Sequence, residues 1–268
     1  MRRTEPLKMA AALLAVCSGV AAAAPCRAVS APYTVALVEL YTSQGCSSCP
    51  PADQWLSRLP AGDPQFKAIP IALHIGYWDY IGWKDPFARK EFNNRQYELA
   101  GYNGKKGVYT PEVFVGAGEV ADWDSPRSFT AALANVNARA PKAQIELQAQ
   151  WVPPSADDRA ARRLAVQARW SADRTSRDPQ LLLAVKRSGY MTSVQAGENS
   201  GATLRNDHVV RAWAGPFKPG SQALTTELSV PAAAGQASLV AIAQDAVSGA
   251  VLQALELPLT ACEPSSNK

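Results

Sequence analysis

The chain has 268 residues, of which 47% are hydrophobic and 19% are charged, and its formal net charge is +4. This composition is ordinary for a folded protein, and the length allows one large domain or two modest ones. No run of basic residues interleaved with aromatic residues occurs, which argues against a nucleic-acid-binding protein.

Residues 1–23 have the layout of a secretory signal peptide. Arg2, Arg3 and Lys8 precede an apolar stretch, and the small residues 21–24 follow it. We place the cleavage after Ala23, because proline is a poor residue directly after a cut. The apolar stretch is too short for a spanning helix, which needs about 20 residues. We therefore expect a periplasmic or secreted bacterial protein with no membrane span in the mature chain.

Export changes the interpretation of the cysteines. Cys26, Cys46, Cys49 and Cys262 remain after cleavage, and an even number in an oxidising compartment favours disulfides. Cys26 and Cys262 lie near the two ends of the chain, and chain ends often lie close together. We expect a structural disulfide between them, with free thiols or a bond to another chain as alternatives.

The first half of the mature chain mixes buried strands with helices. Residues 33–41 and 68–75 are aliphatic and β-branched, as in strands buried on both faces, and residues 54–59 between them have helical spacing. This order predicts a right-handed parallel crossover. Asp85 and Pro86 predict the start of a second helix. A strand entry at 108–115, a short strand at 119–121 and a helix through Asn137 complete this half.

The second half favours a β-sandwich, because short apolar or alternating segments are separated by turn residues. These segments are residues 144–151, 164–170, 181–188, 208–214, 225–230 and 237–245, and a hairpin pairs 239–244 with 250–257. Residues 138–143 mark the boundary, so we expect one domain over 24–140 and another over 141–268. The polar segment 197–207 is expected to be a loop near the domain interface or a surface for a partner.

Three features carry a resemblance to the thioredoxin superfamily over residues 33–137. They are the Cys46-x-x-Cys49 pair after the first strand, the Thr110-Pro111 dipeptide before a later strand, and the closing hairpin and helix. The strings VELYTSQGCSSCPPAD, YWDYIGWKDPFA and YTP also resemble a family of secreted bacterial proteins catalogued as domain of unknown function 1223. The resemblance implies an α/β thioredoxin-like domain followed by an all-β sandwich-like domain, with no established substrate.

The resemblance also implies roles for individual residues. Cys46 is expected to be the exposed attacking thiol, and Cys49 is expected to resolve the mixed disulfide. Pro111 is expected in the cis form beside the pair, where the backbone of Thr110 would pair with substrate. The alternative for Pro111 is a trans proline that starts an edge strand.

The prolines after the pair oppose an activated thiol. Pro50 and Pro51 disfavour helical conformation in the residues before them, so we expect the helix to begin near Pro51. The helix dipole then reaches Cys46 weakly, and Asp53 opposes a thiolate nearby. We therefore expect Cys46 to be less acidic than in strongly oxidising relatives.

Further candidates surround the pair. Glu39 is a candidate proton acceptor for Cys49, with a paired structural carboxylate as the alternative, since a one-residue shift on a strand changes the face. Trp78 either covers the cysteines and contacts an extended peptide or packs over the sheet edge. His74 completes an alternative copper or zinc site with Cys46 and Cys49, or is a hydrogen-bonded structural histidine.

The sequence predicts a thiol-disulfide oxidoreductase that acts on protein thiols or disulfides in the periplasm through Cys46 and Cys49, without a cofactor. Two alternatives remain open. One is a protein that binds copper or zinc through the two cysteines and His74. The other is a binding module in which the Cys46–Cys49 disulfide only fixes a loop.

Overall fold

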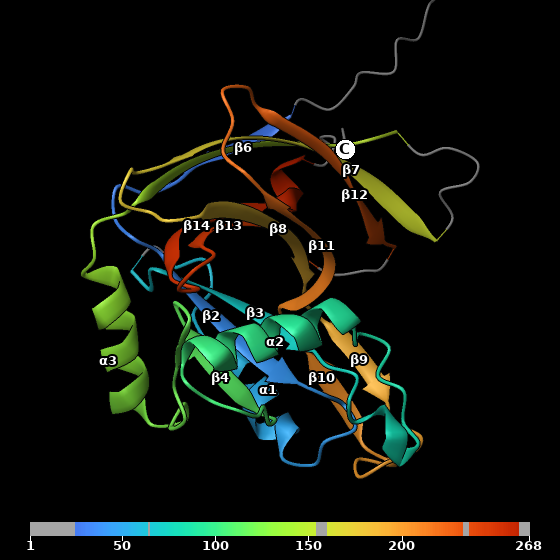
Figure 1. Ribbon diagram of the computed structural model, residues 1–268. Helices are drawn as coiled ribbons and strands as arrows, with labels where there is room; N and C mark the ends of the chain where they lie inside the picture. The colour runs from blue at the N-terminus through green and yellow to red at the C-terminus, as the bar shows by residue number, and fades with distance from the viewer. Residues whose placement is uncertain (1–24, 64, 154–159, 233–235, 263–268) are drawn as a thin grey trace, which may run out of the picture.

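A computed structural model describes residues 25–63, 65–153, 160–232 and 236–262 of the chain. Within these ranges it contains fourteen strands and three α-helices (Figure 1). The predicted signal peptide, residues 1–23, lies outside the described residues. The helices that are described are all too short or too polar to cross a membrane.

The helices belong to the first half of the chain, and the second half consists of strands and one short 3₁₀ helix. The first half contains β1 (Cys26–Val29), β2 (Ala36–Thr42), α1 (Cys49–Ser57), β3 (Ala68–His74), η1 (Asp79–Ile81), α2 (Lys90–Tyr102), β4 (Glu112–Val115), β5 (Gly118–Glu119) and α3 (Pro126–Asn137). The second half contains β6 (Ala143–Trp151), β7 (Ala161–Ala172), β8 (Pro179–Arg187), β9 (Tyr190–Ser193), β10 (Thr203–Asn206), β11 (Val209–Phe217), β12 (Leu224–Pro231), β13 (Ala237–Asp245), β14 (Val251–Pro258) and η2 (Leu259–Cys262).

The largest sheet has eight strands in the order β14-β13-β8-β11-β3-β2-β4-β5. Its β2 and β3 are parallel, and β11 continues the sheet by pairing in parallel with β3 through Val209 and Ala72. A four-stranded antiparallel sheet, β1-β6-β7-β12, packs over the part formed by second-half strands, and β9 and β10 form a separate hairpin. Strands from both sides of residue 140 therefore share one sheet.

The predicted fold class, an α/β thioredoxin-like domain followed by an all-β sandwich-like domain, was wrong. Strands dominate the described chain, in a large mixed sheet and an antiparallel one. The reason lies at the edge of β3, whose backbone groups accept another strand. The amide of Ala72 donates to the carbonyl of His208 at 2.8 Å, which extends the sheet into the second half. The bounds of the two predicted domains remain a prediction.

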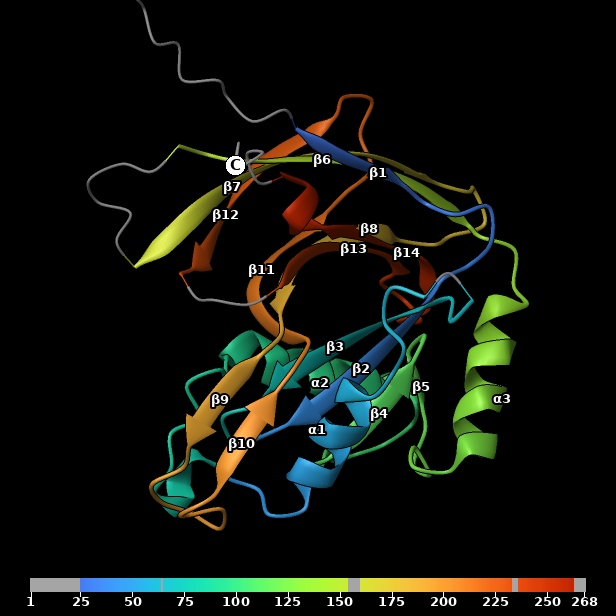
Figure 2. The same ribbon diagram turned by 180° about the vertical axis from the view of Figure 1, so that it is seen from behind.

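The side chains of β2 alternate between two cores, which places helices on both faces of the sheet. Leu37 and Tyr41 pack with Phe92 and Leu99 of α2. The intervening Ala36, Val38 and Leu40 pack with α1 and α3. Figures 1 and 2 show α2 in front of the sheet in one view and α1 in front in the opposite view. The loop between β2 and α1 consequently lies at one end of this layered unit.

A disulfide joins Cys26 of β1 to Cys262 of η2, with the Cα atoms 4.9 Å apart. This is the pair expected from its position near the chain ends. Both cysteines are buried in the core between the four-stranded sheet and the strands β8, β13 and β14. The bond closes a loop over a sequence separation of 236 residues, and restricting the unfolded chain in this way stabilises the fold.

Candidate functional site

Cys46 and Cys49 form a disulfide between the end of β2 and the start of α1, with their Cα atoms 5.5 Å apart. We call residues 43–49 the cysteine loop. α1 begins at Cys49, earlier than the expected start near Pro51. Pro50 and Pro51 are compatible with this start, because the first N–H groups of a helix have no partner within it.

Both cysteines are fully buried, so the expected exposure of Cys46 was wrong. The sulfur of Cys46 lies 3.3 Å from the hydroxyl oxygen of Ser48 and 3.9 Å from the carbonyl oxygen of Thr110. Ser47 and Ser48 are exposed at the tip of the loop. Access to the disulfide therefore requires that a neighbouring segment move.

Trp78 and Thr110, two residues predicted to contact substrate, lie together beside the cysteine loop. The indole N–H of Trp78 donates to the hydroxyl of Thr110 at 2.7 Å. A Cβ atom added to Gly45 would lie 3.3 Å from the Cβ of Trp78, so the tryptophan packs directly on the loop. The Thr110–Pro111 peptide bond is cis. Thr110, which precedes the cis-proline, thus contacts Cys46 through its carbonyl and Trp78 through its hydroxyl.

Replacing Thr110 with valine should lower the free energy of unfolding by about 1 kcal/mol, because the part-buried Trp78 N–H loses its acceptor while the side-chain shape is kept. Chemical denaturation monitored by tryptophan fluorescence would measure the change. Thr225→Val on an exposed position of β12 is the matched control and should change stability by less than about 0.5 kcal/mol. Equal effects of the two substitutions would show that this hydrogen bond contributes nothing.

A segment from the second half also contacts the cysteine loop. We call residues 194–202, which connect β9 to β10, the hairpin tip. The carboxylate of Glu198 accepts a hydrogen bond from the Ser47 amide at 2.9 Å. The side-chain amide of Asn199 donates to the carbonyl oxygens of Gln44 and Cys46, both at 2.9 Å. Figures 1 and 2 show the β9–β10 hairpin beside the lower end of the layered unit.

His74 and Asp85 form a buried pair next to the loop. Nδ1 of His74 lies 2.7 Å from Oδ2 of Asp85, and this oxygen also accepts from the amide of Gln44 at 2.8 Å. Nε2 of His74 is buried and has no hydrogen-bond partner in the described chain. Asp85 is therefore not the cap of α2, which begins at Lys90 after Arg89.

The two groups of this pair favour each other's charged forms. Burial lowers the pKa of His74, but the adjacent Asp85 carboxylate outweighs burial and the pKa lies above its ordinary value. Burial likewise raises the pKa of Asp85, but His74 and the backbone donors at Gln44 and Phe87 bring it below the usual value. The pair is therefore a structural link between β3, the cysteine loop and the segment before α2.

Asp53 is a buried acid one helical turn after Cys49 on α1. Burial raises its pKa to about 7, although the nearby His74 acts in the opposite direction. The sequence reasoning treated Asp53 only as an unfavourable charge near Cys46. Its spacing gave a usable signal, because Cys49, Asp53 and Leu56 lie at helical intervals on the buried face.

The structure does not bring Glu39 to the cysteine pair. Both oxygens of Glu39 bind Arg95 of α2, at 2.6 Å to Nε and 2.9 Å to Nη2, and Tyr41 donates to one of them at 3.1 Å. This partner lies on the α2 face of β2, whereas Cys49 begins α1 on the other face. The contacts match the alternative of a paired structural carboxylate.

The alternative metal ligands Cys46, Cys49 and His74 are not gathered into a site. Among the residues that the structure describes, no group of three or more His, Cys, Asp or Glu side chains is arranged to hold a metal ion. The two sulfurs are bonded to each other, and Nδ1 of His74 faces Asp85. The structure thus offers no support for copper or zinc at these residues.

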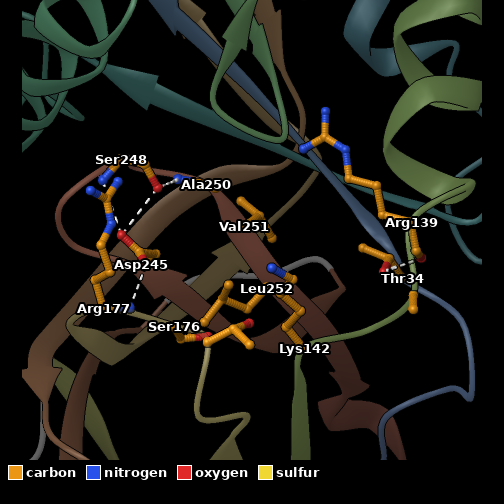
Figure 3. A pocket seen from close by; sticks show the side chains of 12 residues that line it. Thr34, Arg139, Lys142, Ser176, Arg177, Asp245, Ser248, Ala250, Val251 and Leu252 are labelled. Carbon is orange, nitrogen blue, oxygen red and sulfur yellow. Dashed lines mark hydrogen bonds between the residues drawn. The ribbon is translucent and has the colours of Figure 1, made fainter.

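A cavity of about 250 Å³ lies away from the cysteines, beside the turn between β13 and β14 (Figure 3). Its lining includes Arg139, Lys142, Arg177 and Asp245. Asp245 already accepts hydrogen bonds from the backbone of Arg177 and from Ser248, as Figure 3 shows. None of the predicted site residues lines this cavity.

Comparisons with known proteins identify relatives without a stated activity. The family model described as "Protein of unknown function (DUF1223)" matches residues 37–244. No curated protein matches the chain.

Two solved structures are similar in fold. The crystal structure of protein AGR_C_4864 from Agrobacterium tumefaciens has a TM-score of 0.54 and 22% identity, covering 84% of this chain and 94% of that one. HBP35 of Porphyromonas gingivalis has a TM-score of 0.59 and 12% identity, covering 89% of this chain and 79% of that one. At these identities the likeness concerns the fold alone.

Proposed function

We propose, for a chain that belongs to the DUF1223 family of proteins of unknown function, that Cys46 and Cys49 exchange disulfides with protein thiols in an oxidising compartment outside the cytoplasm. The observation that carries this proposal is the disulfide at the start of α1, with a hydroxyl and a carbonyl within 4 Å of Cys46. Ser48 can donate to a thiolate at Cys46, and a helix N-terminus favours negative charge.

The proposed reaction oxidises a dithiol in two steps. A substrate thiolate attacks the sulfur of Cys46, the Cys46–Cys49 bond breaks, and Cys49 leaves as a thiolate that takes up a proton. The second substrate thiolate then attacks the substrate sulfur of the mixed disulfide and expels Cys46. The substrate loses two electrons and two protons, which the cysteine pair gains. The same steps in reverse reduce a substrate disulfide.

Trapping with the Cys49→Ala variant tests this function. The variant is incubated with a peptide disulfide, whose sulfur the Cys46 thiolate attacks. Without the resolving thiol, one peptide should stay bound to Cys46 as a mixed disulfide, detected as an added mass on the intact protein. The Cys46→Ala variant is the control, because Cys49 is the proposed resolving thiol and lies in the first turn of α1, whereas Cys46 precedes the helix. Equal adduct levels in the two variants, or none in either, would contradict the proposal.

A second function, a binding module with a structural disulfide, is favoured by the complete burial of both cysteines. The reduction potential of the pair separates the two functions. An exchange site should equilibrate with glutathione, whereas a potential below about −300 mV is typical of structural bonds. Equilibration against a series of glutathione or dithiothreitol buffers, followed by thiol alkylation, measures it.

A further inference from the structure

The contacts of the hairpin tip with the cysteine loop have an unusual chemical character. Glu198 and Asn199 use their side chains to satisfy three backbone groups of the loop, which are the amide of Ser47 and the carbonyls of Gln44 and Cys46. A carboxylate that accepts from an amide and an amide that donates to carbonyls reproduce the hydrogen bonds of a peptide backbone. The tip therefore fills places at which an extended chain would bind.

The hairpin that carries this tip lies outside the two larger sheets. Its base is anchored by a ring contact between Tyr190 and Phe87 and by the buried Asn206, which accepts from the Gln44 side chain at 2.8 Å. β9 and β10 pair with each other over four residue pairs and with no strand of the two larger sheets. A two-stranded hairpin is marginally stable by itself, and such elements open at low free energy. Glu198 is exposed, so its carboxylate regains water readily when the contact with Ser47 breaks.

The tip fits closely against the segment that follows β3. Gly197 has φ +74°, and a Cβ atom there would lie 3.2 Å from a side-chain carbon of Ile81 and 3.3 Å from the Cβ of Trp83. The glycine permits both the left-handed backbone and the close approach. Both Trp78 and the hairpin tip therefore contact the cysteine loop, and Ile81 lies next to Gly45 of the loop and Gly197 of the tip.

We propose that the hairpin tip is a displaceable strap that holds the place of an extended polypeptide, and that such a polypeptide reaches Cys46 by displacing Glu198 and Asn199. This inference rests on the proposed exchange function, which it extends by naming the substrate class and the control of access. The groups that become available on the cysteine loop are backbone groups, so the substrate is recognised by its main chain, with its cysteine sulfur placed at Cys46.

Displacement also changes the electrostatics around Cys46. In the closed state a carboxylate occupies the Ser47 amide, one residue from the sulfur that must become a thiolate. A nearby negative charge disfavours a thiolate. When a polypeptide displaces the strap, a neutral carbonyl replaces the carboxylate at the Ser47 amide, so access to Cys46 and removal of the opposing charge are coupled.

The test compares the wild type with a double variant, Glu198→Ala with Asn199→Ala, which removes all three hydrogen bonds. The rate at which a water-soluble phosphine reduces the Cys46–Cys49 bond reports access without any need for exchange activity. We expect the rate to rise about tenfold or more, since each lost bond contributes a factor of several. Glu227→Ala, an exposed carboxylate on β12, is the matched control and should leave the rate unchanged.

A second measurement separates failure of the strap from failure of the exchange function. In the Cys49→Ala background, with and without the double variant, the Cys46 thiolate attacks an extended peptide whose single cysteine is held in a disulfide with a small thiol. The small thiol leaves, and the peptide remains bound to Cys46 as a mixed disulfide that is followed by mass. Faster adduct formation in the double variant supports the strap. Peptide exchange by the wild type with equal phosphine rates in both proteins would overturn the strap alone. A faster phosphine rate with no peptide adduct would overturn the exchange function and the polypeptide role together.

Discussion

Replacing Arg95 with methionine should lower the free energy of unfolding by about 3–5 kcal/mol, the range found when one partner of a buried ion pair is removed. Arg95 and Glu39 are both buried, and two hydrogen bonds join them. Arg95 also donates to the side chain of Gln244 at 3.0 Å and lies over the ring of Trp213. The substitution leaves the Glu39 carboxylate buried with Tyr41 as its remaining donor. Urea or guanidinium unfolding measures the loss.

A double substitution provides the control. Glu39→Met combined with Arg95→Met removes both charges, and buried pairs replaced in this way by apolar residues are often nearly neutral. We expect the double variant to be clearly more stable than Arg95→Met alone. A double variant as unstable as the single one would show that packing, not an uncompensated charge, determines the loss.

This pair illustrates what sequence reasoning could reach. Glu39 stands in an apolar strand, which indicated burial, and the one-residue shift in its spacing from Cys46 raised the alternative of a paired structural carboxylate. Its partner Arg95 lies 56 residues later on α2, and no local pattern connects the two. The role of a buried charge depends on its partner, so the sequence alone left two interpretations open.

Strands with clear periodicity were predicted closely. The strand predicted over 68–75 is β3 at Ala68–His74, and the segment predicted over 237–245 coincides with β13. Both are continuous apolar runs, for which local composition is decisive. The pairing of β11 with β3 was not predictable, because it rests on contacts between Val209 and Ala72 that have no sequence signature.

The predicted start of the second helix at Asp85 was wrong. Asp85 followed by proline is a good local start signal, and Oδ1 of Asp85 accepts from the amide of Phe87 at 2.8 Å. The other oxygen, Oδ2, binds the amide of Gln44 and the ring of His74. The helix begins at Lys90. The local signal thus produces a turn, in which the Ala88 amide donates to the carbonyl of Asp85 at 3.2 Å, and not the start of a helix.

The contacts of the hairpin tip, residues 194–202, could not be predicted from the sequence either. Glu198 and Asn199 lie more than 150 residues from the cysteine loop that they contact. The segment 197–207 was predicted as a loop, yet residues 203–206 form β10. Polar composition indicated surface position but not the backbone groups that these side chains bind.

Replacing Asp53 with asparagine should raise the free energy of unfolding by about 2–4 kcal/mol at pH 8. Burial raises the pKa of Asp53 to about 7 in the folded chain, from an ordinary value of 3.8. Between these values the folded state binds more protons than the unfolded state, so stability falls as the pH rises. Above pH 7 the buried carboxylate is charged, and a neutral amide avoids this destabilisation. Below about pH 4 both states are protonated, and the two proteins should be equally stable.

Asp85→Asn is the matched control because the expected sign is opposite. Burial raises the pKa of Asp85, but His74 and backbone donors lower it below the usual value, so its charged form stabilises the fold above the unfolded pKa. Asparagine at Asp85 should therefore destabilise the protein at pH 8, and this loss should persist down to about pH 4, because the charged form of Asp85 stops stabilising the fold only below the unfolded pKa of 3.8. Denaturant unfolding of both variants from pH 4 to pH 8 provides the comparison.

If Asp53→Asn destabilises the chain at pH 8, or if its stability runs parallel to that of the wild type across this range, Asp53 is not the buried acid with a raised pKa. A difference in unfolding free energy between Asp53→Asn and the wild type that grows above pH 5 would show that folded Asp53 holds a proton in this range. Asp53 lies one helical turn from Cys49, and the proposed exchange takes up and releases protons at the cysteine pair.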